Sequence, residues 1–112
     1  MFNSFKYAIR GIKDALKSEP NLRFHFLAAI VVFLLAIVLK FNNTELAILA
    51  LTIFFVIGLE LVNTVVEQIV NLHSKEISEE ARIIKDISAG MVLLAAVGSV
   101  VIAGFLFVPK II

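Results

Sequence analysis

Three apolar segments, each close to the length needed to cross a bilayer, constrain the fold of this chain most strongly. They cover about residues 22–39, 45–66 and 87–108. A bilayer core needs about 20 apolar residues in a helix, and backbone in contact with lipid must satisfy its own hydrogen bonds. Of the 112 residues, 61% are hydrophobic and 17% are charged, whereas a soluble domain has about 25% charged residues. We therefore expect one all-α membrane domain over residues 1–112.

A basic amphipathic helix is predicted before the first span, over residues 2–17. Basic residues lie mostly away from its apolar face, which consists of Phe2, Phe5, Ile9, Ile12 and Leu16. This pattern is typical of a helix that lies at the membrane interface, and a helix packed on a soluble partner is the alternative. Because proline disfavours helix in the residue before it, Glu19-Pro20 predicts a break before the first span.

Basic residues gather on one side of the three predicted spans. Five precede or open the first span and three lie between the second and third: Lys6, Arg10, Lys13, Lys17, Arg23, Lys75, Arg82 and Lys85. On the other side we find only Lys40 and Lys110. The positive-inside rule then predicts a multi-pass protein of the plasma (inner) membrane, with the N-terminus and the 73–86 loop in the cytoplasm.

Four polar residues form a stripe along the second span: Glu60, Asn63, Glu67 and Asn71. Their spacings of three and four residues place them on one face of a helix. A carboxylate within a bilayer costs about 3 kcal/mol, so such a stripe must face protein or water. One three-span chain has little interior to offer, and a cleft between subunits of an oligomer would provide the shelter.

The two carboxylates of the stripe differ in depth by about 10 Å, at 1.5 Å per residue. The deeper one, Glu60, is a candidate general base, and the shallower one, Glu67, is a candidate Mg²⁺ ligand. At the level of Glu67 lie Glu19, in the break, and Lys85-Asp86, which open the third span. Lys85 is suited to phosphate oxygens, and the helix N-terminus adds positive field.

Each of these residues also has a simpler structural interpretation. Lys85 and Asp86 together are typical of a snorkelling helix end. Taken alone, Glu19 is a solvated loop charge, Glu67 an interfacial anchor, and Asn63 a polar contact between helices.

Three motifs, in order and over nearly the whole chain, resemble the prokaryotic diacylglycerol kinase and undecaprenol kinase family. Residues 58–67, GLELVNTVVE, are similar to the family's E-[LI]-[LIV]-N-[TS]-A-[IV]-E signature. Residues 81–90, ARIIKDISAG, look like its A-K-x-A-K-D-x-[AS]-A-G run. Residues 5–11, FKYAIRG, and 18–25, SEPNLRFH, resemble F-x-Y-A-x-x-G and E-x-N-[FL]-R-x-H.

The resemblance implies a homotrimer with active sites between neighbouring subunits, at the cytoplasmic membrane face. It also implies that Mg²⁺ and ATP are used to phosphorylate a lipid hydroxyl. By position, Glu60 matches the catalytic base, and Glu19 and Glu67 match the carboxylates that hold the metal. Nucleotide contacts match Tyr7, Arg10, Glu19, Asn63, Glu67, Lys85 and Asp86, and contacts to the lipid substrate match Glu60, Arg23 and Asn63.

Some residues depart from the family pattern. Asn71 stands where the family usually has aspartate, so a charge is lost there. Ile77-Ser78 replace a common Tyr-His pair, and Val65-Val66 are slightly heavier than the usual Ala-Ile. None of these changes removes a principal carboxylate, so we expect an active enzyme.

The acceptor lipid is left open between undecaprenol and diacylglycerol. The lack of an extension before Phe2 and the Arg23-Phe24-His25 triplet favour undecaprenol. One alternative function is a small transporter or proton channel that uses Glu60 and Glu67 as a relay. A non-catalytic membrane scaffold is another, and nothing points to nucleic acid. The sequence has no cysteine and no G-x-x-x-x-G-K loop, so we expect neither a thiolate site nor a glycine-rich phosphate loop.

Overall fold

The computed structural model describes residues 2–73 and 78–112, and these residues contain helices and no strands. The helices are α1 (Phe2–Ser18), α2 (Pro20–Val38), α3 (Asn43–His73) and α4 (Glu79–Ile111). By length and composition, α2, α3 and α4 can each cross a membrane. The prediction of an all-α membrane protein with an N-terminal helix and three spans is therefore confirmed, and the chain is a multi-pass membrane protein.

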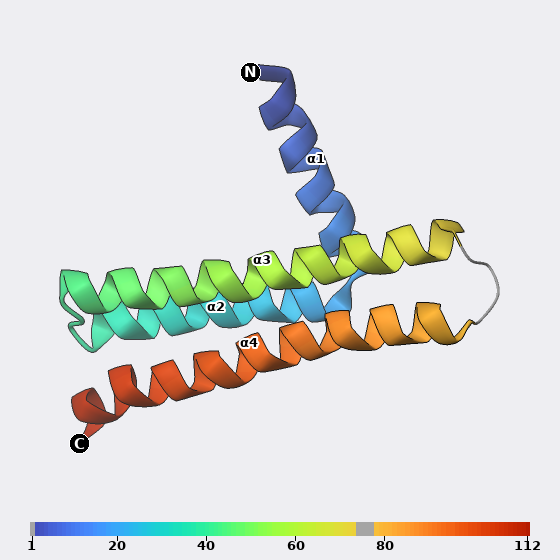
Figure 1. The fold of residues 1–112 in the computed structure, drawn as a ribbon. Helices are drawn as coiled ribbons and strands as arrows, with labels where there is room; N and C mark the ends of the chain where they lie inside the picture. The colour runs from blue at the N-terminus through green and yellow to red at the C-terminus, as the bar shows by residue number, and fades with distance from the viewer. Residues whose placement is uncertain (1, 74–77) are drawn as a thin grey trace.

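The three long helices lie side by side as an antiparallel bundle (Figure 1). Both α2 and α4 pack against α3. One end of the bundle holds the last turns of α3 and the first turns of α4, and we call it the site end. The other, distal end holds the turn between α2 and α3 and the C-terminus. α1 projects away from the bundle from its junction with α2, as Figure 1 shows.

The break between α1 and α2 forms where the sequence predicts it. Glu19 has extended backbone (φ −118°, ψ 101°), and Pro20 occupies the start of α2, where its missing N–H is not needed. Arg23 closes the end of α1, because its Nη1 donates to the carbonyl oxygens of Leu16 (2.8 Å) and Lys17 (3.0 Å). The guanidinium thus satisfies carbonyl groups that a helix C-terminus leaves unpaired.

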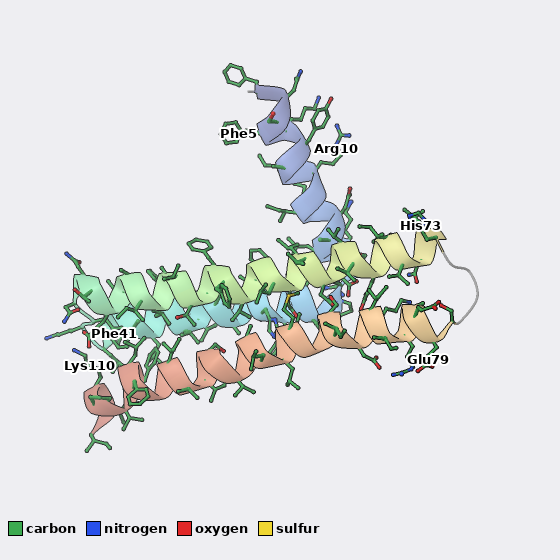
Figure 2. The ribbon with its side chains drawn as sticks, in the orientation of Figure 1. Phe5, Arg10, Phe41, His73, Glu79 and Lys110 are labelled. Carbon is green, nitrogen blue, oxygen red and sulfur yellow. The ribbon has the colours of Figure 1, made fainter. Side chains whose placement is uncertain are left out.

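The distal end is fixed by a small apolar cluster and one ion pair. Phe41 is buried in this cluster and contacts Phe107 of α4, with ring centroids 4.8 Å apart. Lys110 Nζ lies 3.0 Å from Glu45 Oε1, and Figure 2 shows Lys110 beside Phe41 at this end. These contacts tie the end of α4 to the start of α3 and so fix the register of the two helices.

Asn42 caps the start of α3. Asn42 Oδ1 accepts from the Glu45 backbone N–H (2.8 Å), and Glu45 Oε1 accepts from the Asn42 N–H (2.9 Å). This reciprocal pair is a capping box. The helix therefore begins at Asn43.

The connection between α3 and α4 is shorter than expected. The sequence predicts a loop over residues 73–86, whereas α4 begins at Glu79. Ser78 caps it, since its hydroxyl oxygen accepts from the Ala81 backbone N–H at 3.0 Å. A capping serine followed by acidic residues in the first turn favours an early start. The Ile77 departure noted above lies outside the described residues.

Candidate active site

Glu60 is paired with a histidine from the neighbouring helix of the same chain. His25 Nδ1, on α2, lies 2.5 Å from Glu60 Oε2, on α3. The Glu60 side chain is only 11% exposed and that of His25 is 28% exposed. With Glu60 ionised, the Nδ1–H donates to the carboxylate. The deepest carboxylate of the stripe therefore has a polar partner within one subunit.

One chain shelters part of the stripe. Glu60, Asn63 and Glu67 are all partly buried, and Asn71 is exposed. The first turns of α2 cover Glu60, and shelter of the other stripe residues by a neighbouring subunit stays a prediction.

Asn63 and Glu67 form a loosely paired group one to two turns above Glu60. Asn63 Nδ2 lies 3.5 Å from Glu67 Oε1, a long contact. Within the described part of the chain, the buried Asn63 Oδ1 and Ser88 Oγ have no hydrogen-bond partner. A buried polar atom without a partner costs about 1–3 kcal/mol, so such atoms mark places where a ligand or water would be bound favourably.

The site end carries several charged side chains from α4. Lys85 Nζ donates to Asn71 Oδ1 of α3 at 2.7 Å. Arg82 Nη1 donates to Asp86 Oδ2 at 2.7 Å, and the same guanidinium also pairs with Glu79. The Arg82 guanidinium lowers the pKa of the Glu79 carboxyl, and Glu79 and Asp86 raise the pKa of Arg82. Asp86 is thus engaged with Arg82, and Lys85 is held by a neutral amide.

The remaining predicted residues lie on α1 or at its junction with α2. The Glu19 carboxylate makes no capping bond to the first turn of α2. Arg23 is occupied at the end of α1. The Arg10 guanidinium lies 5.1 Å from the centre of the Tyr7 ring, and Figure 2 places Arg10 on the part of α1 that projects from the bundle. Within one chain, Tyr7 and Arg10 are therefore not brought to Glu60.

Glu19 and Glu67 are the carboxylates that could hold a magnesium ion. Among residues 2–73 and 78–112, no group of three or more His, Cys, Asp or Glu side chains is placed to hold a metal. Mg²⁺ usually binds through one or two carboxylates, with substrate phosphates and water as its other ligands. Glu19 makes no capping bond, and Glu67 has only a long contact, so both have oxygens to offer.

His25 is the site residue to which the sequence reasoning gave no role. A depth comparison could have found it. His25 lies six residues inward from Glu19, and Glu60 lies seven residues inward from Glu67. At 1.5 Å per residue, the two side chains reach almost the same depth on antiparallel helices.

Comparison with known proteins gives consistent matches over most of the chain. The family model described as prokaryotic diacylglycerol kinase matches residues 6–107. A diacylglycerol kinase of Synechocystis sp. is 39% identical over 107 residues, which cover 95% of this chain and 61% of that protein. An undecaprenol kinase of Bacillus subtilis is 36% identical over 109 residues, covering 97% and 89%. A diacylglycerol kinase of Haemophilus influenzae is 30% identical over 108 residues, covering 96% and 92%.

Proposed function

The chain belongs to the prokaryotic diacylglycerol kinase family, a family of lipid kinases, and we propose that it transfers the γ-phosphate of ATP to the hydroxyl group of a membrane lipid. The observation that carries this proposal is the partly buried Glu60, with one oxygen held by His25, below the Asn63–Glu67 pair. A general base at this depth meets a lipid alcohol, while the site end above it is open to a soluble nucleotide.

The proposed reaction is an in-line phosphoryl transfer. The lipid hydroxyl oxygen forms a bond to the γ-phosphorus as the bond to the ADP oxygen breaks, and the hydroxyl proton passes to Glu60. Such a transfer needs positioning and charge neutralisation more than covalent chemistry. Lys85, held by the neutral Asn71, would contact phosphate oxygens. Glu19 and Glu67 would hold Mg²⁺, which supplies further neutralisation of phosphate charge when bound.

We place this reaction at the cytoplasmic face of the plasma membrane. Two lines of support are the basic residues of α1 and of the site end, and the need for ATP. We further propose a homotrimer whose active sites lie between subunits. Tyr7 and Arg10 are remote from Glu60 in one chain, so a neighbouring subunit's α1 is a natural source of these two side chains.

Two acceptor lipids fit the relatives equally well. The Bacillus subtilis relative is an undecaprenol kinase and the other two are diacylglycerol kinases, at similar identities. Both lipids are alcohols whose hydroxyl lies at the membrane surface, and we propose that one of them is the acceptor.

The decisive experiment is transfer of radiolabelled phosphate from ATP to each lipid by the purified protein and by Glu60→Gln. We expect phosphorylation of one lipid by the unsubstituted protein. The variant should lose at least about 10²-fold in kcat, because an amide cannot take the hydroxyl proton. Glu80→Gln, an exposed neutralisation on α4, is the matched control and should retain activity.

Two outcomes would contradict this function. Normal lipid phosphorylation by Glu60→Gln would remove Glu60 from the reaction. Proton flux in liposomes without ATP, together with no phosphorylated lipid, would favour the relay alternative instead.

A further inference from the structure

We propose that His25 is a positioning residue that holds the Glu60 carboxylate in the orientation needed to act as base. This inference rests on the proposed function, since it assigns a task to the partner of its general base. Three observations support it: one short contact between two helices, the partial burial of both side chains, and the apolar surroundings of the imidazole.

The contact divides the two oxygens of the carboxylate between two tasks. His25 Nδ1 lies 2.5 Å from Oε2, which leaves Oε1 as the oxygen that accepts the proton of the lipid hydroxyl. A free glutamate side chain samples many rotamers, and fixing one of them costs conformational entropy. Because His25 comes from α2, helix packing fixes this side chain before the lipid arrives.

The imidazole also borders an apolar pocket of the bundle. His25 forms part of the wall of a cavity of about 210 Å³ between α2, α3 and α4. The other lining side chains are apolar or hydroxyl-bearing, including Ala28, Thr52, Ala96 and Ser99. A hydrogen bond in such a low-dielectric environment is stronger than one in water. His25 therefore gives Glu60 a strong donor at a depth where water is scarce.

A purely structural role for His25 is the rival explanation. Polar contacts between membrane helices stabilise their association, so His25 could serve only to hold α2 against α3. The two roles differ in what replacement does. A positioning role requires a donor at the Nδ1 position, and its loss lowers kcat. If His25 has only a structural role, its replacement lowers activity only to the extent that the folded assembly is lost.

The test compares His25→Leu, which removes the donor, with His25→Asn, whose side-chain amide places an N–H near the Nδ1 position. We expect kcat to fall by about 10²-fold in His25→Leu, with KM for ATP within about twofold, as expected when an interaction made in the transition state is lost. His25→Asn should stay within about tenfold of the unsubstituted kcat. The second histidine, His73, is exposed, and His73→Leu and His73→Asn are the matched controls that should leave kcat unchanged.

A spectroscopic measurement keeps the proposal testable if His25→Leu does not fold. The chain has two histidines, so ¹⁵N spectra of the imidazole nitrogens contain two sets of signals. We expect a protonated Nδ1 for His25, and we expect its signal to move in Glu60→Gln while the signals of His73 stay in place. A His25 signal that is insensitive to Glu60→Gln overturns the proposal.

The kinetic outcomes are equally distinct. Unsubstituted kcat in His25→Leu, or equal losses in His25→Leu and His25→Asn, overturns the positioning role while the kinase function stands. In the Glu60→Gln background, His25→Leu should reduce the residual rate by less than about twofold. His25 acts only through the Glu60 carboxylate, so its loss has little further effect once that carboxylate is gone. A full additional loss there overturns the proposal. If the unsubstituted protein phosphorylates neither lipid, the proposed function itself fails.

Discussion

Lys85 is held by the neutral side chain of Asn71, which leaves its ammonium group charged for a phosphate. Its Nζ donates to the amide oxygen of Asn71 at 2.7 Å, which fixes its position, and it forms no ion pair with the carboxylates of residues 2–73 and 78–112. We expect Asn71→Asp to raise KM for ATP by about two- to fivefold, since an exposed carboxylate competes weakly with phosphate for the ammonium group. The effect should shrink in high salt, because salt screens exposed pairs.

Initial rates at varied ATP concentration and two salt concentrations measure this effect. Gln68→Glu adds the same charge nearby on α3, at an exposed position, and serves as the control that should leave KM for ATP unchanged. A lower KM in Asn71→Asp would contradict the competition and would indicate that a carboxylate there helps to hold the nucleotide.

The site residues on α3 could be predicted from spacing alone, whereas their partners could not. Intervals of three and four residues place Glu60, Asn63 and Glu67 on one face, and the structure shows all three partly buried. The pairing of Glu60 with His25 depends on how α2 packs against α3, which local periodicity does not specify. The engagement of Arg23 with the end of α1 was missed for a different reason, because a basic residue near a predicted phosphate site suits either role.

At the level of elements, the turn that joins α2 to α3 holds a lysine in an unfavourable conformation. Lys40 has φ 61°, in the left-handed region. Its N–H donates to the Ile37 carbonyl oxygen (3.0 Å), and the Phe41 N–H donates to that of Ala36 (3.1 Å). This is the Schellman arrangement, in which glycine is the favoured residue at the left-handed position. We expect Lys40→Gly to raise the free energy of unfolding by about 0.5–1 kcal/mol.

Unfolding in detergent mixtures, followed by loss of helical signal, measures this change. Lys40→Ala is the matched control, because it removes the same charge and keeps the side-chain Cβ that makes the conformation unfavourable. Lys40→Gly should therefore be more stable than Lys40→Ala. Equal stability of the two variants would contradict an origin in the backbone conformation.

Helix type and order could be predicted at this scale, and helix ends less well. The apolar runs predicted all three long helices because a lipid-facing backbone has few other solutions. The helical pattern also continues past the second span to about Leu72, close to the end of α3 at His73, but α4 already begins at Glu79. Outside the lipid, a helix ends where its capping residues and packing end it. The length of the apolar run therefore does not predict these ends.

For the whole molecule, the placement of α1 was the least predictable feature. Its amphipathic pattern indicates an interfacial helix, yet the pattern sets no angle to the bundle. The structure separates Tyr7 and Arg10 from Glu60 within one chain. A subunit with its own base but with two expected nucleotide contacts elsewhere is what a site shared between neighbours would produce, and this is why we propose an oligomer.

The orientation of the whole molecule determines whether ATP can reach the site end. The chain has no cysteine, so single cysteines report orientation without background labelling. Asn43→Cys lies at the distal end and Glu80→Cys at the site end, and both positions are exposed. With the basic residues inside, we expect an impermeant maleimide to label Asn43→Cys on intact cells and Glu80→Cys only after permeabilisation.

Kinase activity in both variants would show that the labelled protein is assembled. Labelling of Glu80→Cys on intact cells would place the site end outside, where cytoplasmic ATP cannot reach it, and would contradict the proposed reaction at the cytoplasmic face.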